Sequence, residues 1–280
     1  MKLYLTATPT PGRVRGLLRL LLARPDRRDD RRRLGTMFQP PPLRPAKAPT
    51  HAIDETLAAL VELGLVREDD DVVVASPDLS LDRLPDVLAA AALKPEIHGE
   101  PNRFARTVGW FLAQPVGGVP AGYGAIKSAL LAVRDKPGWD LHIDSDDRLD
   151  MVVYWAKYLG LLRPTRESKG EGLVPDPTTF LRRRLRELFP TEQPEPVQQF
   201  RERLGAICPV LDGGAVREQV LAAFGIAWPD NRLSSALAFA LRRLRSEKLV
   251  EFGYFNDARP ENFLLLGETE RVTTFRGPSA

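Results

Sequence analysis

RLSSALAFALRRLRSEKLVEFGYFNDARPENFLLL, residues 232–266, is the stretch of sequence that decides the fold. In its first half, apolar side chains recur at helical spacing and form one face, composed of Leu233, Leu237, Ala240, Leu241 and Leu244. Asp230 precedes this helix as its expected cap. Two strands are predicted to follow, at 249–255 and 263–266, joined by a polar wing at 256–262. A helix followed by a β-ribbon is the second half of a winged helix.

The residues before this stretch supply the other half of that fold. Helices are predicted at 198–211 and 216–224, and Gly213-Gly214 breaks the chain between them. Residues 191–280 are therefore predicted to form a C-terminal winged-helix unit.

The N-terminal third shows the same order of elements. Helices are expected at 11–23 and 29–38, and a third helix follows Thr50 and ends at Gly64. A two-stranded ribbon at 65–74 turns through Asp69, Asp70 and Asp71. Residues 1–95 are predicted to be an N-terminal winged-helix unit with a basic second helix and an acidic third helix.

The middle third, residues 96–190, is predicted to be helical and winged-helix-like. Its three helices are expected at 102–114, 123–133 and 146–158, but no clear wing follows, and 164–172 is expected to be flexible. A further helix at 177–188 precedes a Pro/Glu-rich linker at 190–197.

In each of the three predicted units, the third helix ends in a similar sequence, and these ends align as an internal repeat. They are LAALVELGLV at 57–66, VVYWAKYLGLL at 152–162 and LRRLRSEKLV at 241–250, each an amphipathic helix that stops just before a short apolar strand. The predicted fold class is mainly α with short β-hairpins, arranged as tandem winged-helix (helix-turn-helix) units.

Composition excludes several classes of protein. The hydrophobic fraction of 43% is ordinary for globular domains. There is no long apolar run and no signal-peptide pattern, so a soluble cytoplasmic protein without membrane association is expected. Cys208 is the only cysteine; it is expected to be a small buried hydrophobe, and no cysteine-rich zinc site can form.

Charge is distributed in blocks along the chain. Residues 1–50 hold twelve Lys/Arg against three Asp, a net charge of +9, whereas residues 51–100 hold three Lys/Arg against twelve Asp/Glu, a net charge of −9. Neighbouring elements of opposite charge either neutralise each other or meet different partners.

No catalytic constellation is evident, and neither a metal site nor a cofactor is predicted. His51, His98 and His142 lie in different predicted units, without metal-ligand spacing. The acidic groups at 69–71 and at 144–147 are interpreted as a wing tip and a helix cap. The glycine-rich stretch 117–128 follows a helix and lacks a glycine before Lys127, so it is interpreted as a turn between helices and not as a phosphate loop. We therefore expect a protein that is not an enzyme.

The third helix of the last unit carries the residue types that bind duplex DNA. Arg232, Ser234 and Ser235, at its start, are candidates for base contacts, and Arg242, Arg243 and Arg245 are candidates for phosphate contacts. Arg182, Arg183 and Arg184 form a second basic group. The alternative is that these arginines pair with acidic neighbours such as Glu247 or with a partner protein. If the basic segments 27–33, 182–186 and 232–245 form one continuous strip on the surface, DNA binding is favoured. If they form separate patches whose charges are paired within the protein, a scaffold function is favoured.

The first unit has the opposite character on its third helix. That helix presents Asp54, Glu55 and Glu62 next to the triply acidic turn, so phosphate repulsion opposes insertion into a DNA groove. Its basic segment at 27–33 is expected either to touch a DNA backbone or to dock on the acidic half of its own unit. Protein docking suits this unit better.

The order of landmarks resembles the DpdG family of bacterial gene clusters for 7-deazaguanine modification of DNA and the associated restriction. The resemblance runs over most of the chain, through RRDDRRRLGTMF, ETLAALVELGLVRED, NRFARTVGWFLAQ, DDRLDMVVYWAKYLGLL, PDPTTFLRRRL, PVLDGG and SSALAFALRRLRSEKLV. These segments mark packing positions and turns, not catalytic motifs. The resemblance implies a cytoplasmic accessory protein that works beside helicases, ATPases and nuclease-like partners in anti-phage defence, and it supplies no active-site residues.

Three functional hypotheses follow. The first is a non-enzymatic accessory subunit of a DNA modification and restriction system that binds double-stranded DNA, recruits partner proteins, or does both. The second is a pure protein–protein scaffold that bridges ATPase or helicase subunits, as winged-helix subunits do in condensin-like complexes. The third is a hydrolase, which requires carboxylates or histidines that converge in a pocket.

Overall fold

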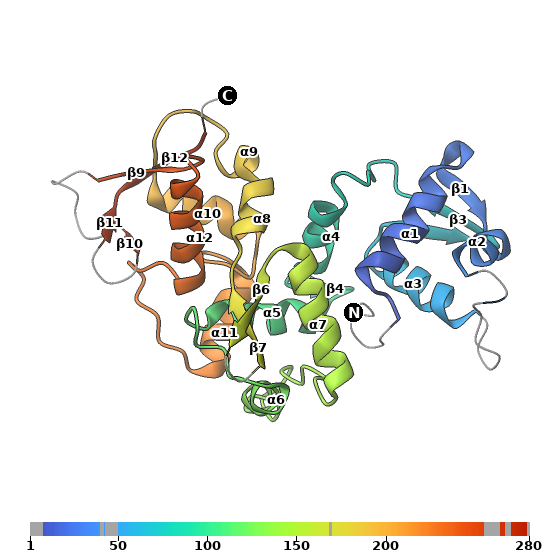
Figure 1. The fold of residues 1–280 in the computed structure, drawn as a ribbon, viewed down its shortest axis with the longest axis horizontal. Coiled ribbons are helices and arrows are strands. Elements are labelled where there is room, and N and C mark those ends of the chain that lie inside the picture. Colours follow the sequence, from blue (N-terminus) through green and yellow to red (C-terminus); the bar gives the residue numbers. More distant parts are fainter. Residues whose placement is uncertain are drawn as a thin grey trace.

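A computed structural model describes residues 8–39, 42, 50–167, 170–254, 264–266 and 270–278. Helices predominate and are accompanied by small antiparallel sheets, so the fold is mixed α and β (Figure 1). The predicted wing at 256–262 and most of the proline-rich segment at 39–49 lie outside the described residues.

The first unit contains three helices and a three-stranded sheet. Its elements are α1 (Pro11–Leu22), the short 3-10 helix η1 (Pro25–Arg27), β1 (Arg28–Asp30), α2 (Arg31–Phe38), α3 (His51–Glu62), β2 (Val66–Asp69) and β3 (Val72–Ala75). The strand order is β1-β3-β2. The predicted start of the second helix at residue 29 is wrong, because Arg28–Asp30 pairs with Val72–Val74 and the Asp30 carboxylate instead caps α2 at the backbone N–H of Arg33.

Two elements without a sequence-based prediction connect the first unit to the middle one. They are the helix α4 (Leu84–Ala92) and the hairpin of β4 (Glu96–Ile97) and β5 (Glu100–Pro101). The apolar face of α4 is buried at Leu84, Leu88 and Ala92, and α4 packs against α7.

The middle unit contains α5 (Arg103–Ala113), α6 (Tyr123–Leu131), α7 (Asp146–Leu159), β6 (Leu162–Glu167) and β7 (Gly170–Pro175). The expectation of a flexible stretch at 164–172 without a wing is wrong, because β6 and β7 form an antiparallel hairpin that runs from the Leu162–Pro175 pair to the Glu167–Gly170 pair. The glycine-rich stretch connects α5 to α6 directly, as interpreted, and it turns at Gly117 and Gly122, both with positive φ.

The predicted helix at 177–188 is divided in two. It consists of α8 (Thr178–Arg183) and α9 (Leu185–Leu188), and the chain leaves helical geometry at Arg184. The predicted linker that follows is partly ordered into the last sheet, since β8 (Glu195–Pro196) pairs with the strand at 274–276.

The last unit contains α10 (Val197–Ile207), α11 (Ala215–Phe224), α12 (Ser235–Ser246), β9 (Glu251–Gly253), β10 (Leu264–Leu266), β11 (Glu270–Val272) and β12 (Thr274–Arg276). The predicted ribbon of 249–255 with 263–266 is wrong in its pairing. β9 pairs with β12 in the sheet β8-β12-β9, and β10 pairs with β11. The buried ring of Phe275 explains this pairing, because it contacts the rings of Phe200 and Phe252.

The three aligned helix ends share one backbone geometry. Gly64, Gly160 and Lys248 have φ of +70°, +79° and +60°, and the backbone N–H of the next residue donates to the carbonyl five residues back in each case. These bonds are Leu65 to Leu60, Leu161 to Ala156, and Leu249 to Leu244. The internal repeat predicted from the sequence is therefore a repeated helix-ending motif.

The units pack on one another through buried side chains. The Trp155 indole N–H of α7 donates to the Pro9 carbonyl at the start of α1, 2.9 Å away. Gly109 of α5 lies against Val216 and Val220 of α11, with no side chain of its own to separate the helices. The boundaries at 95/96 and 190/191 stay predictions.

Candidate nucleic-acid interface

The N-terminal end of α12 is a buried cluster of polar groups and is not exposed for contacts with DNA bases. Ser234, and not Asp230, caps the helix, with its hydroxyl oxygen accepting from the Leu237 N–H at 3.2 Å. That hydroxyl also donates to the Asp212 carboxylate at 2.6 Å, and the Ser234 N–H donates to the same carboxylate at 2.7 Å. Because Ser234 is only 1% exposed, the structure excludes it from the predicted base contacts.

Ser235 and Arg232, the other two residues predicted to contact bases, also make hydrogen bonds within the protein. The Ser235 hydroxyl accepts from the backbone N–H of Val116, in the turn between α5 and α6. Arg232 is half-buried, and its carbonyl accepts from the Trp228 indole N–H at 2.8 Å. The N-terminal end of α12 therefore joins the last unit to the middle unit.

The three arginines in the second half of α12 all pair with carboxylates. Arg242 and Arg245 both contact Glu270 of β11, at 3.1 and 2.5 Å. Arg243 contacts the Asp176 carboxylate, which is nearly fully buried and also accepts from Arg163 and from the Thr178 hydroxyl and N–H. Arg243 therefore fastens α12 to the start of α8, whereas the other two arginines pair at the surface.

The arginines of α8 point in different directions. Arg182 makes a bidentate ion pair with the Glu247 carboxylate at the end of α12, with N–O distances of 2.6 to 3.0 Å. Arg183 donates to Asp86 of α4 at 2.9 Å and to the Leu159 carbonyl of α7 at 2.7 Å. Arg184 is buried and donates to the Asp86 carbonyl and to Glu187, so it is not available to a ligand.

The basic segments do not form the single strip considered from the sequence. α8 and α12 pack side by side, so Arg182 shares one surface with the arginines in the second half of α12. The segment at 27–33 lies at the other end of the molecule, where Arg31 pairs with Asp54 and Glu68 of its own unit (Figure 1). These carboxylates raise the pKa of Arg31, the hydrogen bond to Asp54 most strongly. The basic segment of the first unit thus docks on its own acidic half.

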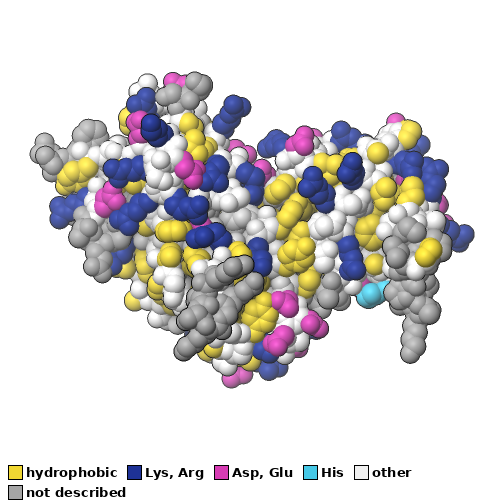
Figure 2. All heavy atoms as spheres, viewed as in Figure 1, with side chains coloured by type: hydrophobic (Ala, Val, Ile, Leu, Met, Phe, Trp, Pro, Cys, Tyr) yellow, Lys and Arg dark blue, Asp and Glu magenta, His cyan; other side chains and the backbone are white. Residues whose placement is uncertain are grey.

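Four of the nine predicted contact residues keep partly exposed side chains on the shared surface of α8 and α12. The side chains of Arg242 and Arg245 are 48% and 52% exposed, and those of Arg182 and Arg243 are both 39% exposed. Arg186, which carries a positive charge one turn beyond Arg182, is exposed as well. Figure 2 shows dark-blue side chains gathered over this end of the molecule, with a few magenta ones between them. The alternative of pairing with acidic neighbours such as Glu247 is seen at Arg182. The sequence did not indicate Glu270 and Asp176, the partners of the α12 arginines, because they are distant in the chain.

The described residues offer little for catalysis or metal binding. In that part of the chain no three His, Cys, Asp or Glu side chains come together as metal ligands. Burial raises the pKa of the Cys208 thiol to about 12, so it stays protonated at neutral pH and is a poor nucleophile. No helix within the described ranges combines the length and the apolar character needed to cross a membrane.

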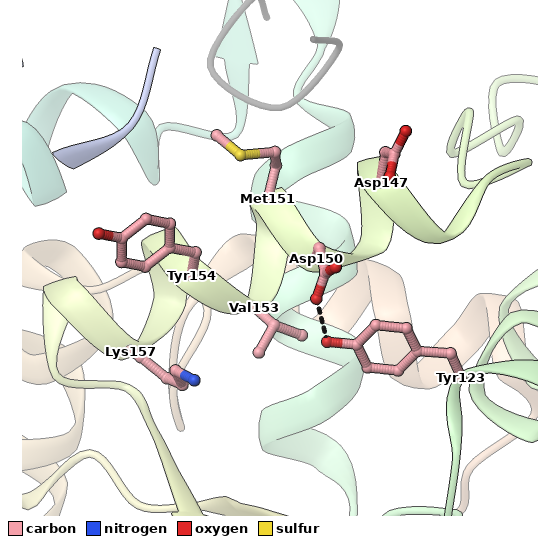
Figure 3. Close-up of a pocket in the computed structure, with 7 residues that line it drawn as sticks. All are labelled: Tyr123, Asp147, Asp150, Met151, Val153, Tyr154 and Lys157. Atoms are coloured by element: carbon pink, nitrogen blue, oxygen red, sulfur yellow. Dashed lines mark hydrogen bonds between the residues drawn. The ribbon is translucent and has the colours of Figure 1, made fainter. Parts of the chain in front are cut away.

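A hollow of about 330 Å³ lies along α7 (Figure 3). Its lining includes Tyr154, Lys157, Asp147 and Asp150, and Tyr123 of α6 donates its hydroxyl hydrogen bond to Asp150. The two aspartates come from one helix face, and no second element brings another carboxylate or a histidine into the lining. The hollow therefore lacks the arrangement that hydrolysis requires.

Comparison with known protein families identifies the family of this chain. The model of the DpdG-like family matches residues 1–258, which is most of the chain. No curated protein and no solved structure matches it. The chain belongs to the DpdG-like family.

Proposed function

We propose that this protein is a non-enzymatic, cytoplasmic accessory subunit of a bacterial DNA modification and restriction system, and that it binds double-stranded DNA through the outer surface of α12 and α8. The observation that carries the proposal is the group of exposed guanidinium groups on that surface, Arg242, Arg245 and Arg182. Membership of the DpdG-like family provides the DNA-modification context.

The winged-helix interpretation supports this choice of surface. In the last unit, α10, α11 and α12 precede the strands β9 and β12, and α12 is the third helix, the position of a recognition helix in a winged helix. Its buried N-terminal end leaves the second half as the part that contacts DNA. Arginines there meet phosphates, so binding is expected to depend little on base sequence.

The ion pairs on this surface do not prevent DNA binding. Pairs between exposed side chains contribute only about 0–1 kcal/mol and weaken with salt, so phosphates can replace Glu270 as the partner of Arg242 and Arg245. Arg243 is different, since its partner Asp176 is nearly fully buried. We expect Arg243 to hold the helix in place and the two outer arginines to bind.

The test is fluorescence anisotropy of a labelled duplex over a range of salt concentrations. Replacing Arg242 and Arg245 by Ala removes two phosphate contacts, so the slope of log K against log salt becomes shallower by about 1.8. Glu270→Gln has the opposite effect, tighter binding, because it frees both arginines from a competing carboxylate.

The matched control removes the same charge elsewhere. Arg28 and Arg32 are exposed in the first unit, at the far end from α12. Replacing both by Ala should leave the salt slope unchanged. Equal losses in the two double variants, or no duplex binding by the unaltered protein at low salt, would refute the proposal.

A second candidate function is a scaffold that recruits an ATPase, helicase or nuclease subunit of the same system. A surface of the first unit favours it, where exposed Val61 borders a hollow of about 470 Å³ between the end of α3 and the strands β2 and β3. Co-purification with such a subunit that survives high salt and Arg242→Glu, but is lost in Val61→Asp, would support this function.

A further inference from the structure

We propose that the C-terminal half of α7, flanked by arginines of α1 and α8, binds an unpaired nucleic-acid strand by stacking bases on tyrosine rings. This surface, hereafter the tyrosine strip, consists of Tyr154 and Tyr158 with Lys157, Arg15 and Arg183. It shares the helix α8 with the proposed duplex surface but none of the arginines assigned to duplex binding, and none of its residues except Arg183 was considered as a site residue from the sequence.

The two tyrosines lie one helical turn apart on the same face of α7. Tyr154 is 46% exposed, so the residue is accessible to a ligand. Tyr154 lies one turn after Asp150 on α7, and both line the hollow shown in Figure 3, with Tyr154 at its C-terminal end and the Tyr123–Asp150 pair at its N-terminal end. Tyr158 is half-buried, and its ring lies edge-on against Trp155 at 5.8 Å, which fixes its orientation.

Two arginines from other helices lie near the Tyr158 end of the strip. Arg183 of α8 is held there by its hydrogen bond to the carbonyl of Leu159, the residue after Tyr158, and it also pairs with the Asp86 carboxylate of α4, which a phosphate would have to compete with. Arg15 is exposed on α1, which the bond from Trp155 to Pro9 joins to α7. Burial raises the pKa of the Tyr158 hydroxyl, and both arginines oppose that rise, so both charges reach this ring.

The charge of α7 changes along its length. Asp146, Asp147 and Asp150 lie in the first turns, whereas Lys157 lies in the last turn beside the two tyrosines. Figure 2 shows the same change, with yellow side chains over the upper part of α7, dark-blue ones on both sides, and magenta ones below. A strand that follows the strip therefore meets cations at the C-terminal end of the helix and is repelled at the other end.

Aromatic rings flanked by cations suit a single strand better than a duplex. Every unpaired base has a face that can stack on a tyrosine, and arginines at the sides neutralise the adjacent phosphates. In a duplex the base faces are already stacked on each other. An acidic peptide would use the arginines but gain little from the two rings.

The experiment measures binding of a labelled oligothymidine about 12 nucleotides long, which spans a single-strand site and forms no duplex with itself. Tyr154→Ala should weaken binding by between about fivefold and 150-fold, whereas Tyr154→Phe, which keeps the ring, should bind as the unaltered protein does. Arg15→Ala should make the salt slope shallower by about 0.7.

Three controls keep the outcome interpretable. Tyr254→Ala removes an exposed tyrosine outside the strip and should not affect binding. Thermal unfolding of Tyr154→Ala should resemble that of the unaltered protein, because the ring is already exposed. Tyr154→Ala should also leave duplex affinity unchanged, while the double variant of Arg242 and Arg245 should leave oligothymidine affinity unchanged, so the two surfaces can fail independently.

The proposal is overturned if the oligothymidine does not bind at low salt, or if Tyr154→Ala binds it as well as Tyr154→Phe does. It is also overturned if polyglutamate displaces the oligothymidine from the unaltered protein and binds Tyr154→Ala equally well. That result would assign the strip to an acidic protein partner.

Discussion

The first and last units present the same order of three helices before a closing sheet strand, yet their third helices carry opposite charge. α3 carries half-buried acidic residues, among them Asp54 and Glu62, whereas α12 exposes Arg242 and Arg245. In each unit the compensating charges come from another element. Arg31 of α2 neutralises Asp54, and Glu270 of β11 neutralises Arg242 and Arg245.

This comparison teaches that the order of helices and strands does not determine which charge the third helix carries. The two third helices end in the same backbone motif, at Gly64 and Lys248. Their packing and their helix starts differ, however, and these differences give measurable effects on stability.

The largest expected effect concerns a glycine in the first helix of each unit. A Cβ on Gly205 of α10 would lie 2.2 Å from the Gly213 carbonyl oxygen, whereas a Cβ on Gly16 of α1 meets nothing within 4 Å. Gly205→Ala should therefore destabilise the protein by about 3 kcal/mol or more, since backbone must move. Gly16→Ala should stabilise it by about 0.5–1 kcal/mol, because alanine favours a helix more than glycine does.

Urea unfolding followed by circular dichroism measures both changes. Effects of the same sign and size in the two helices would show that α10 is not packed against the turn at Gly213 as described.

A medium effect is expected at the starts of the third helices. Ser234→Ala removes the cap of α12 and one buried hydrogen bond to Asp212, a loss of about 2 kcal/mol. Thr50→Ala at the start of α3 should change stability by less than about 0.5 kcal/mol, because the Thr50 side chain makes no capping bond. Thermal unfolding of the two variants compares them directly, and a larger loss for Thr50→Ala would contradict the assignment.

The smallest effect is expected at the ends of the same helices. Lys248 has a φ of +60°, a conformation that costs a residue with a side chain roughly 1–2 kcal/mol, so Lys248→Gly should raise stability by up to about 1 kcal/mol. Gly64→Ala should lower it by about 1 kcal/mol, since only the backbone conformation opposes the new methyl group. Chemical unfolding midpoints test this pair, and opposite signs are required.

Much of the helical framework follows from the sequence, because apolar spacing sets it locally. The predicted helices at 102–114, 146–158 and 216–224 agree closely with α5, α7 and α11. Strand pairing is harder to predict because the partners are distant in the chain. Nothing near Glu195 indicates that it pairs with Phe275, and nothing near Arg28 indicates that it pairs with Val74.

The candidate site was only partly predictable for the same reason. Composition and helical spacing indicated that Arg242 and Arg245 face outward, and they do. The burial of Ser234 depends on Asp212, which lies before α11 and 22 residues away. Tyr154 attracted no interpretation, because a tyrosine on a helix is ordinary until its neighbours leave its ring uncovered.

The position of β12 also affects how the protein is made. The sheet of the first unit needs no residue beyond Ala75, so it can form while most of the chain is still being synthesised. The sheet of the last unit needs Phe275 between Glu195 and Phe252, and that contact spans about 80 residues. Until residue 276 has left the ribosome, the rings of Phe200 and Phe252 lack their central partner, so the core of this unit closes later than that of the first.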